Sequence, residues 1–257
     1  YEARLTRFYL AVAGGGAAGG LLAALGAPLV FRSVTEYPLA LAACAGIVAL
    51  RCPALRGAAA KPGFRAWAVA LGGAALWLLL AKATERHSSA RTVFCDRNFY
   101  GSLAVTQTRE PFGRDGVQPV NYLWCGQTTH GIQIRSDKFR RQPTAYYGQT
   151  GGGIAFNACP RYREGLPVKA GVVGLGAGTL ACYGRPGDLF RFYEINPLVV
   201  RVATDPALFT FLPDAKAAID LVPGDARRML EKERAAGDPL YDVLVVDAYS
   251  GDAVPYH

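Results

Sequence analysis

The sequence predicts an α/β protein in which N-terminal transmembrane helices precede a small antiparallel β domain and a parallel, doubly wound sheet. Uncharged apolar runs crowd the first third of the chain, and short alternating, aromatic-rich segments follow them. The last third repeats a unit of apolar strand, turn and helix. We expect four parts: residues 1–81 as transmembrane helices from the end of a larger membrane domain, 82–91 as a linker, 92–150 as the β domain and 151–257 as an α/β domain truncated at its C-terminus.

Charge and cysteine content exclude several functions. The chain has a formal net charge of +8, carried mostly by arginine. It has no basic helix interleaved with aromatic residues and no nucleic-acid motif, so we expect no nucleic-acid partner. The six cysteines form no CxxC pair and have no histidines at metal-ligand spacing. We therefore expect no metal site and a reducing compartment.

Tyr9–Phe31 is an uncharged segment of about 23 residues, long enough to cross a bilayer. Its glycines at GxxxG spacing would let a second helix approach closely. A signal peptide is the alternative, but the segment is too long and its glycines are misplaced for one. Tyr37–Leu50 is short for a span unless it starts near Val34, and Ala66–Ala81 is near the lower limit. We expect two to three spans.

The positive-inside rule conflicts with the expected position of the rest of the chain in the cytosol. The segment Arg51–Arg65 is rich in Arg and Lys, which the positive-inside rule would make cytoplasmic. A third full span would then place the rest of the chain outside, away from cytosolic nucleotides. Either one short segment does not cross or the rule fails locally, and both interpretations stay open.

The segment after the polar linker has the pattern of a small β region. Thr92–Val105 and Val117–Trp124 are typical of an antiparallel hairpin, and Arg109–Gly116 supplies a Pro/Gly turn between them. Thr129–Ile134 is expected to form another short strand. We expect this region to lay a loop across the mouth of the α/β unit.

Gly174, Gly176 and Gly178 mark the most informative part of the sequence. The apolar run Ala170–Val173 is suited to a buried parallel strand, and the glycines follow where the backbone can turn sharply and approach a ligand. Thr179–Tyr183 is expected to begin a helix whose free N–H groups point back at the turn.

Glu194 ends the next expected strand, Phe190–Tyr193, about 20 residues beyond the first glycine, where an acid can hold the hydroxyls of a ribose. A β-turn-α unit with glycines used only for packing is the alternative, because a GxGxG pattern alone is weak. The acid at this distance favours a nucleoside ligand.

Two further expected strands also end near acids. A helix begins near Pro197, and the strand Ala218–Val222 is followed by Asp225. The strand Tyr241–Val246 ends on Asp247. Doubly wound sheets bind ligands at the carboxyl ends of their strands, so we expect these acids and the glycine turn to converge there.

Taken together, GLGAG, Glu194, Gly224-Asp225-Ala226 and the run DAYSGD beginning at Asp247 resemble the spermidine synthase (polyamine aminopropyltransferase) family, in particular its bacterial members fused to a membrane domain. The resemblance extends from Arg97 to the end of the chain and includes RNFYGSLAV, HGIQ and PTAYY. It implies a Rossmann-like, methyltransferase-type sheet after a small β domain. It also implies an enzyme of polyamine biosynthesis that moves an aminopropyl group from decarboxylated S-adenosylmethionine to an amine such as putrescine, releasing methylthioadenosine.

The resemblance also implies residue roles. The nucleoside pocket would comprise Gly174, Gly176, Gly178, Glu194, Asp225 and Ala226. Glu194 would hold the ribose hydroxyls and Asp225 would accept from the adenine amino group. Asp247 would orient and deprotonate the amine as catalytic base, although an acid that only caps the next turn is the alternative. The amine groove would include Tyr146, Tyr147, Gln133, His130 and Asp252.

Two departures from the family pattern affect the choice of donor. Ala177 stands where the family has an aspartate that pairs with the aminopropyl arm, and the usual Asp-Gly before the glutamine is absent. Losing one member of a buried ion pair costs about 3–5 kcal/mol, so we expect the usual donor to bind poorly unless another acid substitutes. A transferase that uses intact S-adenosylmethionine is one alternative. A non-catalytic membrane protein that binds a nucleoside or polyamine is another, and a purely structural α/β domain is a third.

The resemblance, with the apolar N-terminal third, predicts a protein of the bacterial inner membrane, in contact with lipid, whose soluble domain lies in the cytoplasm. Members of that family are often dimers or tetramers, and whether this chain forms a homo-oligomer stays an open question.

Overall fold

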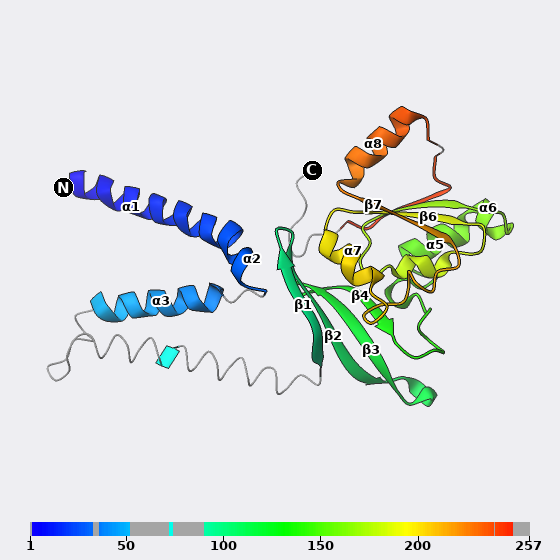
Figure 1. The fold of residues 1–257 in the computed structure, drawn as a ribbon, viewed down its shortest axis with the longest axis horizontal. Helices are drawn as coiled ribbons and strands as arrows, with labels where there is room; N and C mark the ends of the chain where they lie inside the picture. Colours follow the sequence, from blue (N-terminus) through cyan, green and yellow to red (C-terminus); the bar gives the residue numbers. More distant parts are fainter. Residues whose placement is uncertain (1, 33–35, 52–71, 74–89, 239, 249–257) are drawn as a thin grey trace. The chain divides into compact units, whose positions relative to one another are not determined.

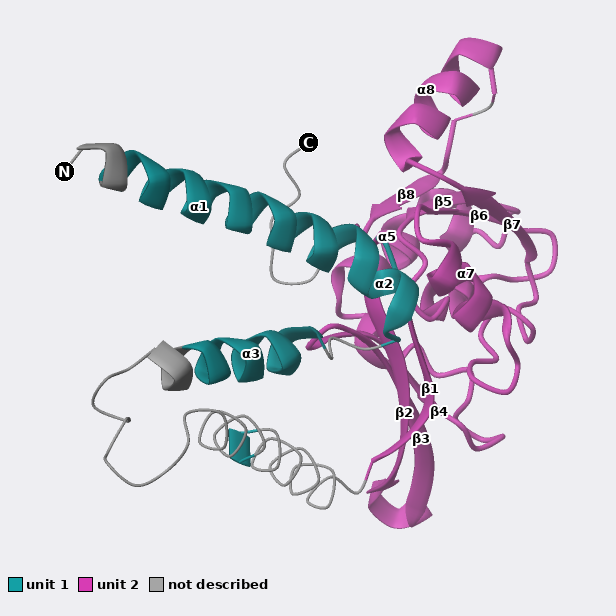
Figure 2. Ribbon diagram, turned by 60° about the vertical axis from the view of Figure 1, so that its left-hand side comes forward, with its two compact units in different colours: residues 1–89, 97–99 teal, residues 90–96, 100–257 magenta. Residues whose placement is uncertain are grey.

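The structure is a computed structural model that describes residues 2–32, 36–51, 72–73, 90–238 and 240–248. It divides into two compact units, residues 1–89 with 97–99 and residues 90–96 with 100–257 (Figure 2). The predicted linker, residues 82–91, lies outside the described residues except for 90–91. Two four-stranded sheets, one antiparallel and one parallel, make the protein α/β.

An apolar helix dominates the described part of the first unit. α1 (Glu2–Leu21) continues through the π-helical turn η1 (Leu22–Gly26) into α2 (Ala27–Val30). The π turn ends two residues before Pro28, whose ring nitrogen cannot donate a helical hydrogen bond, so a change of helical register there is expected. Over Leu5–Val30, 26 residues, the helix is long and apolar enough to cross a membrane, a test that a signal sequence near an N-terminus also passes.

The second predicted span coincides with α3 (Glu36–Arg51), whose apolar part, Glu36–Ile47, is shorter than a bilayer requires. The third, Ala66–Ala81, lies outside the described residues except for two helical positions, 72–73.

The antiparallel sheet is a meander of four strands in the order β1-β2-β3-β4 (Figure 1). Its strands are β1 (Arg91–Asn98), β2 (Gly101–Pro111), β3 (Val117–Cys125) and β4 (Thr128–Ile134). The expected stretch Thr92–Val105 is therefore two strands, joined by a tight turn with Gly101 at a φ of 124°. The predicted turn between β2 and β3 is also shorter than expected, because β2 pairs with β3 as far as Pro111.

The parallel sheet has the order β7-β6-β5-β8. Its strands are β5 (Lys169–Val173), β6 (Leu189–Glu194), β7 (Ala218–Pro223) and β8 (Val243–Val246). The helices of this part of the chain are α5 (Gly151–Ala158), α6 (Pro160–Arg163), α7 (Pro197–Thr204) and α8 (Ala226–Ala236).

Helices cover both faces of the parallel sheet, as β6 shows. Phe190 and Phe192 point to one face, where Phe190 stacks on Phe156 of α5 with ring centroids 5.3 Å apart. Residues of β6 alternate between faces, so Arg191 and Tyr193 point to the other. There the Tyr193 hydroxyl donates to Glu233 of α8 at 2.5 Å and Arg191 pairs with the same carboxylate at 3.1 Å.

The predicted helix after the glycines is only a short 3₁₀ turn, η5 (Thr179–Tyr183). The sequence Gly184-Arg185-Pro186-Gly187 follows at once and cannot continue a helix. Asp188 fixes this turn from inside, because its buried carboxylate accepts from the backbone N–H groups of Val168 and Arg185, both at 2.9 Å.

A shared core joins the two sheets into one unit. Leu103, Val105 and Leu123 of the antiparallel sheet are fully buried in one cluster with Val202 of α7 and Ala177 of the glycine-rich loop. Burial of several large apolar side chains is the main favourable term in such an interface. The β region is therefore packed onto the α/β region rather than tethered to it.

The closest approach in this interface is between Gly131 of β4 and Ala177. A Cβ atom added at Gly131 would lie 2.4 Å from the Ala177 Cβ and 3.1 Å from its backbone nitrogen. Gly131 has no positive φ, so steric space and not backbone freedom requires glycine here.

Gly131→Ala is expected to lower the free energy of unfolding by about 1–3 kcal/mol, because overpacking forces the neighbouring backbone to shift. Chemical denaturation of the full chain in detergent measures the change. Gly151→Ala is the matched control, since a Cβ there meets nothing within 4 Å. Combining Gly131→Ala with Ala177→Gly should restore part of the loss. Equal stability of the two single variants would contradict the assigned contact.

Candidate functional site

The four parallel strands bring the predicted acids to one edge of the sheet. The backbone N–H of Gly224 donates to the carbonyl of Glu194 at 2.9 Å, which places the turn before Asp225 beside the end of β6. The Asp247 N–H donates to the Val173 carbonyl at 2.9 Å, which places Asp247 beside the glycine-rich loop. Glu194, Asp225 and Asp247 therefore lie at or just after the ends of strands that finish at the same edge of the sheet.

The glycine-rich loop is held by backbone contacts on both sides. Gly174, Gly176 and Gly178 have φ values of 92°, 52° and 80°, which residues with a Cβ rarely adopt. A Cβ on Gly174 would lie 2.4 Å from the Asp247 carbonyl oxygen, and one on Gly176 would lie 2.6 Å from the His130 carbonyl oxygen. The missing side chains thus make room for protein backbone, a different reason from the ligand approach that the sequence suggested.

Glu194 closes the loop from the other side. Its two carboxylate oxygens accept from the backbone N–H groups of Leu175, at 3.0 Å, and Asn196, at 2.8 Å. Burial raises the pKa of Glu194, and the hydrogen bonds from backbone N–H groups partly offset that rise. A carboxylate has about four acceptor positions, and the Ile195 N–H takes a third, so Glu194 keeps an acceptor position for a ligand hydroxyl.

Asp225 and Ala226 lie at the start of α8. The Asp225 carboxylate caps this helix by accepting from the Arg228 N–H at 3.1 Å. This bond uses one carboxylate oxygen of the exposed Asp225 side chain. The other oxygen is available to a ligand at the carboxyl end of β7.

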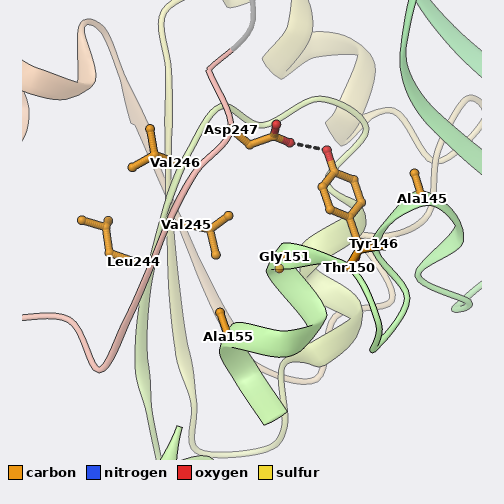
Figure 3. Close-up of a pocket in the computed structure, with 10 residues that line it drawn as sticks. Ala145, Tyr146, Thr150, Gly151, Ala155, Leu244, Val245, Val246 and Asp247 are labelled. Carbon is orange, nitrogen blue, oxygen red and sulfur yellow. Dashed lines mark hydrogen bonds between the residues drawn. The ribbon is translucent and has the colours of Figure 1, made fainter. Parts of the chain in front are cut away.

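Asp247 is exposed at the end of β8, and Tyr146 donates its hydroxyl to Asp247 Oδ2 (Figure 3). Burial, together with this carboxylate, raises the pKa of Tyr146, so the phenol stays protonated and remains a donor. Tyr146 is held in turn by Tyr183, whose hydroxyl donates to the Tyr146 carbonyl. The pair of Asp247 and Tyr146 connects residues 101 positions apart in the sequence.

A cavity of about 420 Å³ adjoins this pair. The residues that line it are Ala145, Tyr146, Thr150, Gly151, Gly152, Ala155, Leu244, Val245, Val246 and Asp247. In Figure 3, Val245 and Asp247 lie on the side of β8 that faces Tyr146 and α5, and Leu244 and Val246 lie on the other side. Cavities of this size hold small organic ligands.

Sequence reasoning missed the α5 side of this cavity. Thr150 is the N-cap of α5 and its side chain makes no capping hydrogen bond to the helix. Gly153 is required for packing, since a Cβ there would lie 2.3 Å from the Tyr147 carbonyl oxygen, and a Cβ on Gly152 would lie 2.9 Å from the side-chain atom Leu180 Cδ2. The sequence did contain a signal for a helix start here. Thr150, a polar residue, and three glycines precede an apolar stretch.

His130 lies between the two halves of the site. Its carbonyl oxygen contacts the glycine-rich loop, and its side chain is half-buried within the electrostatic influence of Asp247. Burial lowers the pKa of His130 and the Asp247 carboxylate partly offsets this, so the imidazole is neutral near pH 7.

The remaining predicted amine-site residues lie elsewhere. Gln133 is fully buried, donates to the Arg140 carbonyl at 2.8 Å and accepts from the Thr210 N–H at 2.9 Å, so its amide holds a loop in place. Tyr147 is exposed and does not line the described cavity. Asp252 lies outside the described residues.

Ala177 is 1% exposed and packs against Gly131. An aspartate side chain there would have to enter the core shared by the two sheets. The described residues contain no group of three or more His, Cys, Asp or Glu that could hold a metal ion.

No protein-family model matches the chain, and comparisons with curated proteins and with solved structures find no match either.

A pH-dependent stability difference tests the burial of Glu194. A raised pKa means that the folded state binds the proton more tightly than the unfolded state, so folding gains from protonation as the pH falls toward the ordinary glutamate value. The stability of the wild-type chain relative to Glu194→Gln is therefore expected to rise as the pH is lowered from 7 toward 4.5, the ordinary value. Parallel denaturation curves of the two proteins measure it. A constant difference, or one of opposite sign, would show that Glu194 is not desolvated.

Proposed function

We propose that the chain is an alkyl transferase of the aminopropyltransferase type, moving an aminopropyl group from decarboxylated S-adenosylmethionine to a primary amine and releasing methylthioadenosine. The observation that carries the proposal is the position of Asp247. Its backbone packs against Gly174 and its carboxylate meets Tyr146 beside the cavity. One acid thus adjoins both a candidate nucleoside edge and a candidate amine cavity.

The fold supports this proposal at the level of architecture. We interpret the parallel sheet, with its glycine-rich loop after β5 and acids after β6, β7 and β8, as Rossmann-like and methyltransferase-type. The helix over Leu5–Val30 is interpreted as a membrane span. The proposed location is the bacterial inner membrane, with the second unit in the cytoplasm.

The donor would lie along the edge from the glycine-rich loop to Asp225. Glu194 would accept from the ribose hydroxyls and Asp225 from the adenine amino group. The sulfonium end would then point along the edge toward Asp247, on the far side of β5 from β7. The neutral imidazole of His130 adds no positive charge to repel the sulfonium.

The acceptor amine would enter from the cavity. Its nitrogen lone pair attacks the carbon next to the sulfonium, the new C–N bond forms as the C–S bond breaks, and the electron pair of the broken bond leaves with sulfur as a neutral thioether. Before this attack the bound ammonium gives one proton to the Asp247 carboxylate, which frees the lone pair, and the product leaves as a secondary ammonium. Holding the reactants in line supplies several kcal/mol of the barrier reduction, and the positioned base adds about 10²–10⁴-fold.

The buried position of Ala177 favours a second candidate for the donor. Without an acid there, nothing at that position pairs with the ammonium of the aminopropyl arm. Intact S-adenosylmethionine would place a carboxylate in the same region, so a transferase that uses it, for methyl or another group, is the alternative.

A donor comparison separates the two candidates. The full chain in detergent is incubated with each sulfonium compound and putrescine or a monoamine, and nucleoside products are separated by chromatography. Methylthioadenosine from the decarboxylated donor supports aminopropyl transfer. Turnover or tight binding of only the carboxylated donor would overturn it in favour of the alternative. Nucleoside binding without turnover of either donor would indicate a non-catalytic binding protein.

Asp247→Asn is expected to lower turnover by at least about 10²-fold, because the amine loses its proton acceptor, while methylthioadenosine binding changes little. The matched control is Asp242→Asn, the same chemical change at the other end of β8, where Asp242 accepts from the Lys169 N–H at 2.8 Å. The control should retain wild-type turnover once its stability is matched. Equal turnover of Asp247→Asn and the wild type would remove Asp247 from the mechanism.

A further inference from the structure

The residues that line the cavity limit the charge of the amine that it can bind, which the proposed reaction alone does not. Asp247 is the only charged residue among those that line the described cavity. It lies at one end, paired with the Tyr146 hydroxyl. Away from Asp247 the cavity is lined by small and apolar groups, for example Val245 of β8 and Ala155 of α5.

The polar groups of the α5 wall do not favour a second cation. The Thr150 hydroxyl donates to the Tyr147 carbonyl at 2.8 Å and does not cap the helix. Gly151 and Gly152 begin α5, and the first N–H groups of a helix present partial positive charge. A cation held by Asp247 is therefore paired, whereas a second cation farther along would face apolar groups and helix N–H groups.

We propose that this cavity binds a primary amine that carries a single positive charge and an uncharged, largely apolar body, and that it discriminates against diamines and polyamines. The inference rests on the proposed function for its identification of the ligand as the acceptor. The ammonium pairs with the Asp247 carboxylate beside the Tyr146 hydroxyl, and the body extends along Val245 toward Ala155. Discrimination arises because the far ammonium of a diamine would lose water without gaining a partner.

Matched ligand pairs test this directly, by a measurement that does not require turnover. Calorimetry with the full chain in detergent compares butylamine with putrescine and hexylamine with 1,6-diaminohexane. Within each pair the carbon chain is the same and only the second ammonium differs. We expect the monoamine to bind at least tenfold more tightly in both pairs, and Asp247→Asn to abolish binding of both members.

A designed second acid should reverse the preference. Ala155 lines the cavity from α5, so Ala155→Asp would offer the far ammonium a partner and should strengthen diamine binding at least tenfold relative to the monoamine. Ala155→Asn is the control of equal size without the charge, and it should keep the wild-type preference. If Ala155→Asp does not fold, the wild-type ligand pairs alone decide.

The outcomes separate this inference from the proposed reaction. Preference for monoamines supports the inference, whether or not transfer is observed. Equal or tighter binding of diamines overturns it, and the proposed reaction stands if methylthioadenosine is still released. Failure of every amine to bind overturns the inference as well.

Discussion

The architecture of the site depends on backbone packed against backbone around the loop that follows β5. Gly174 touches the carbonyl of Asp247, and Gly176 touches the carbonyl of His130. A side chain at either glycine would push apart β5 and β8, or the loop and β4. The positive φ values at both glycines make any larger residue costly for a second reason. This loop therefore sets where Asp247 and His130 lie, before any side-chain interaction is considered.

Two neighbouring regions of different character follow from that constraint. On one side of the loop the strand ends carry Glu194 and Asp225, both of which already accept hydrogen bonds from backbone N–H groups. On the other side Asp247 and Tyr146 adjoin a cavity with otherwise uncharged walls. A bound nucleoside and a bound amine would thus approach Asp247 from different directions. Such an arrangement suits a direct displacement, in which the protein mainly aligns two reactants.

Much of this could be predicted from local patterns. Apolar runs ending in acids specified the parallel strands and their carboxyl edge, and Glu194, Asp225 and Asp247 lie there because parallel strands end together. The extent of η5 could not be predicted from apolar pattern alone, because the Gly-Pro turn and the buried Asp188 end it early.

Long-range packing explains what the sequence did not reveal. The contact between Gly131 and Ala177 joins residues that are 46 positions apart in the sequence. Only the folded core explains why both residues are small. Gln133 was expected in the amine groove because of its neighbours in sequence, yet its amide serves the loop that carries Thr210. A polar residue in a motif can be buried for packing as readily as it can bind a ligand.

We propose that the edge between the glycine-rich loop and Asp225 binds an adenosine. The most direct measurement is an experimental structure of the full chain with methylthioadenosine bound. We expect the ribose hydroxyls at Glu194, the adenine amino group at Asp225 and the thioether directed toward Asp247. A nucleoside bound at any other surface, or an edge closed by protein side chains, would contradict it.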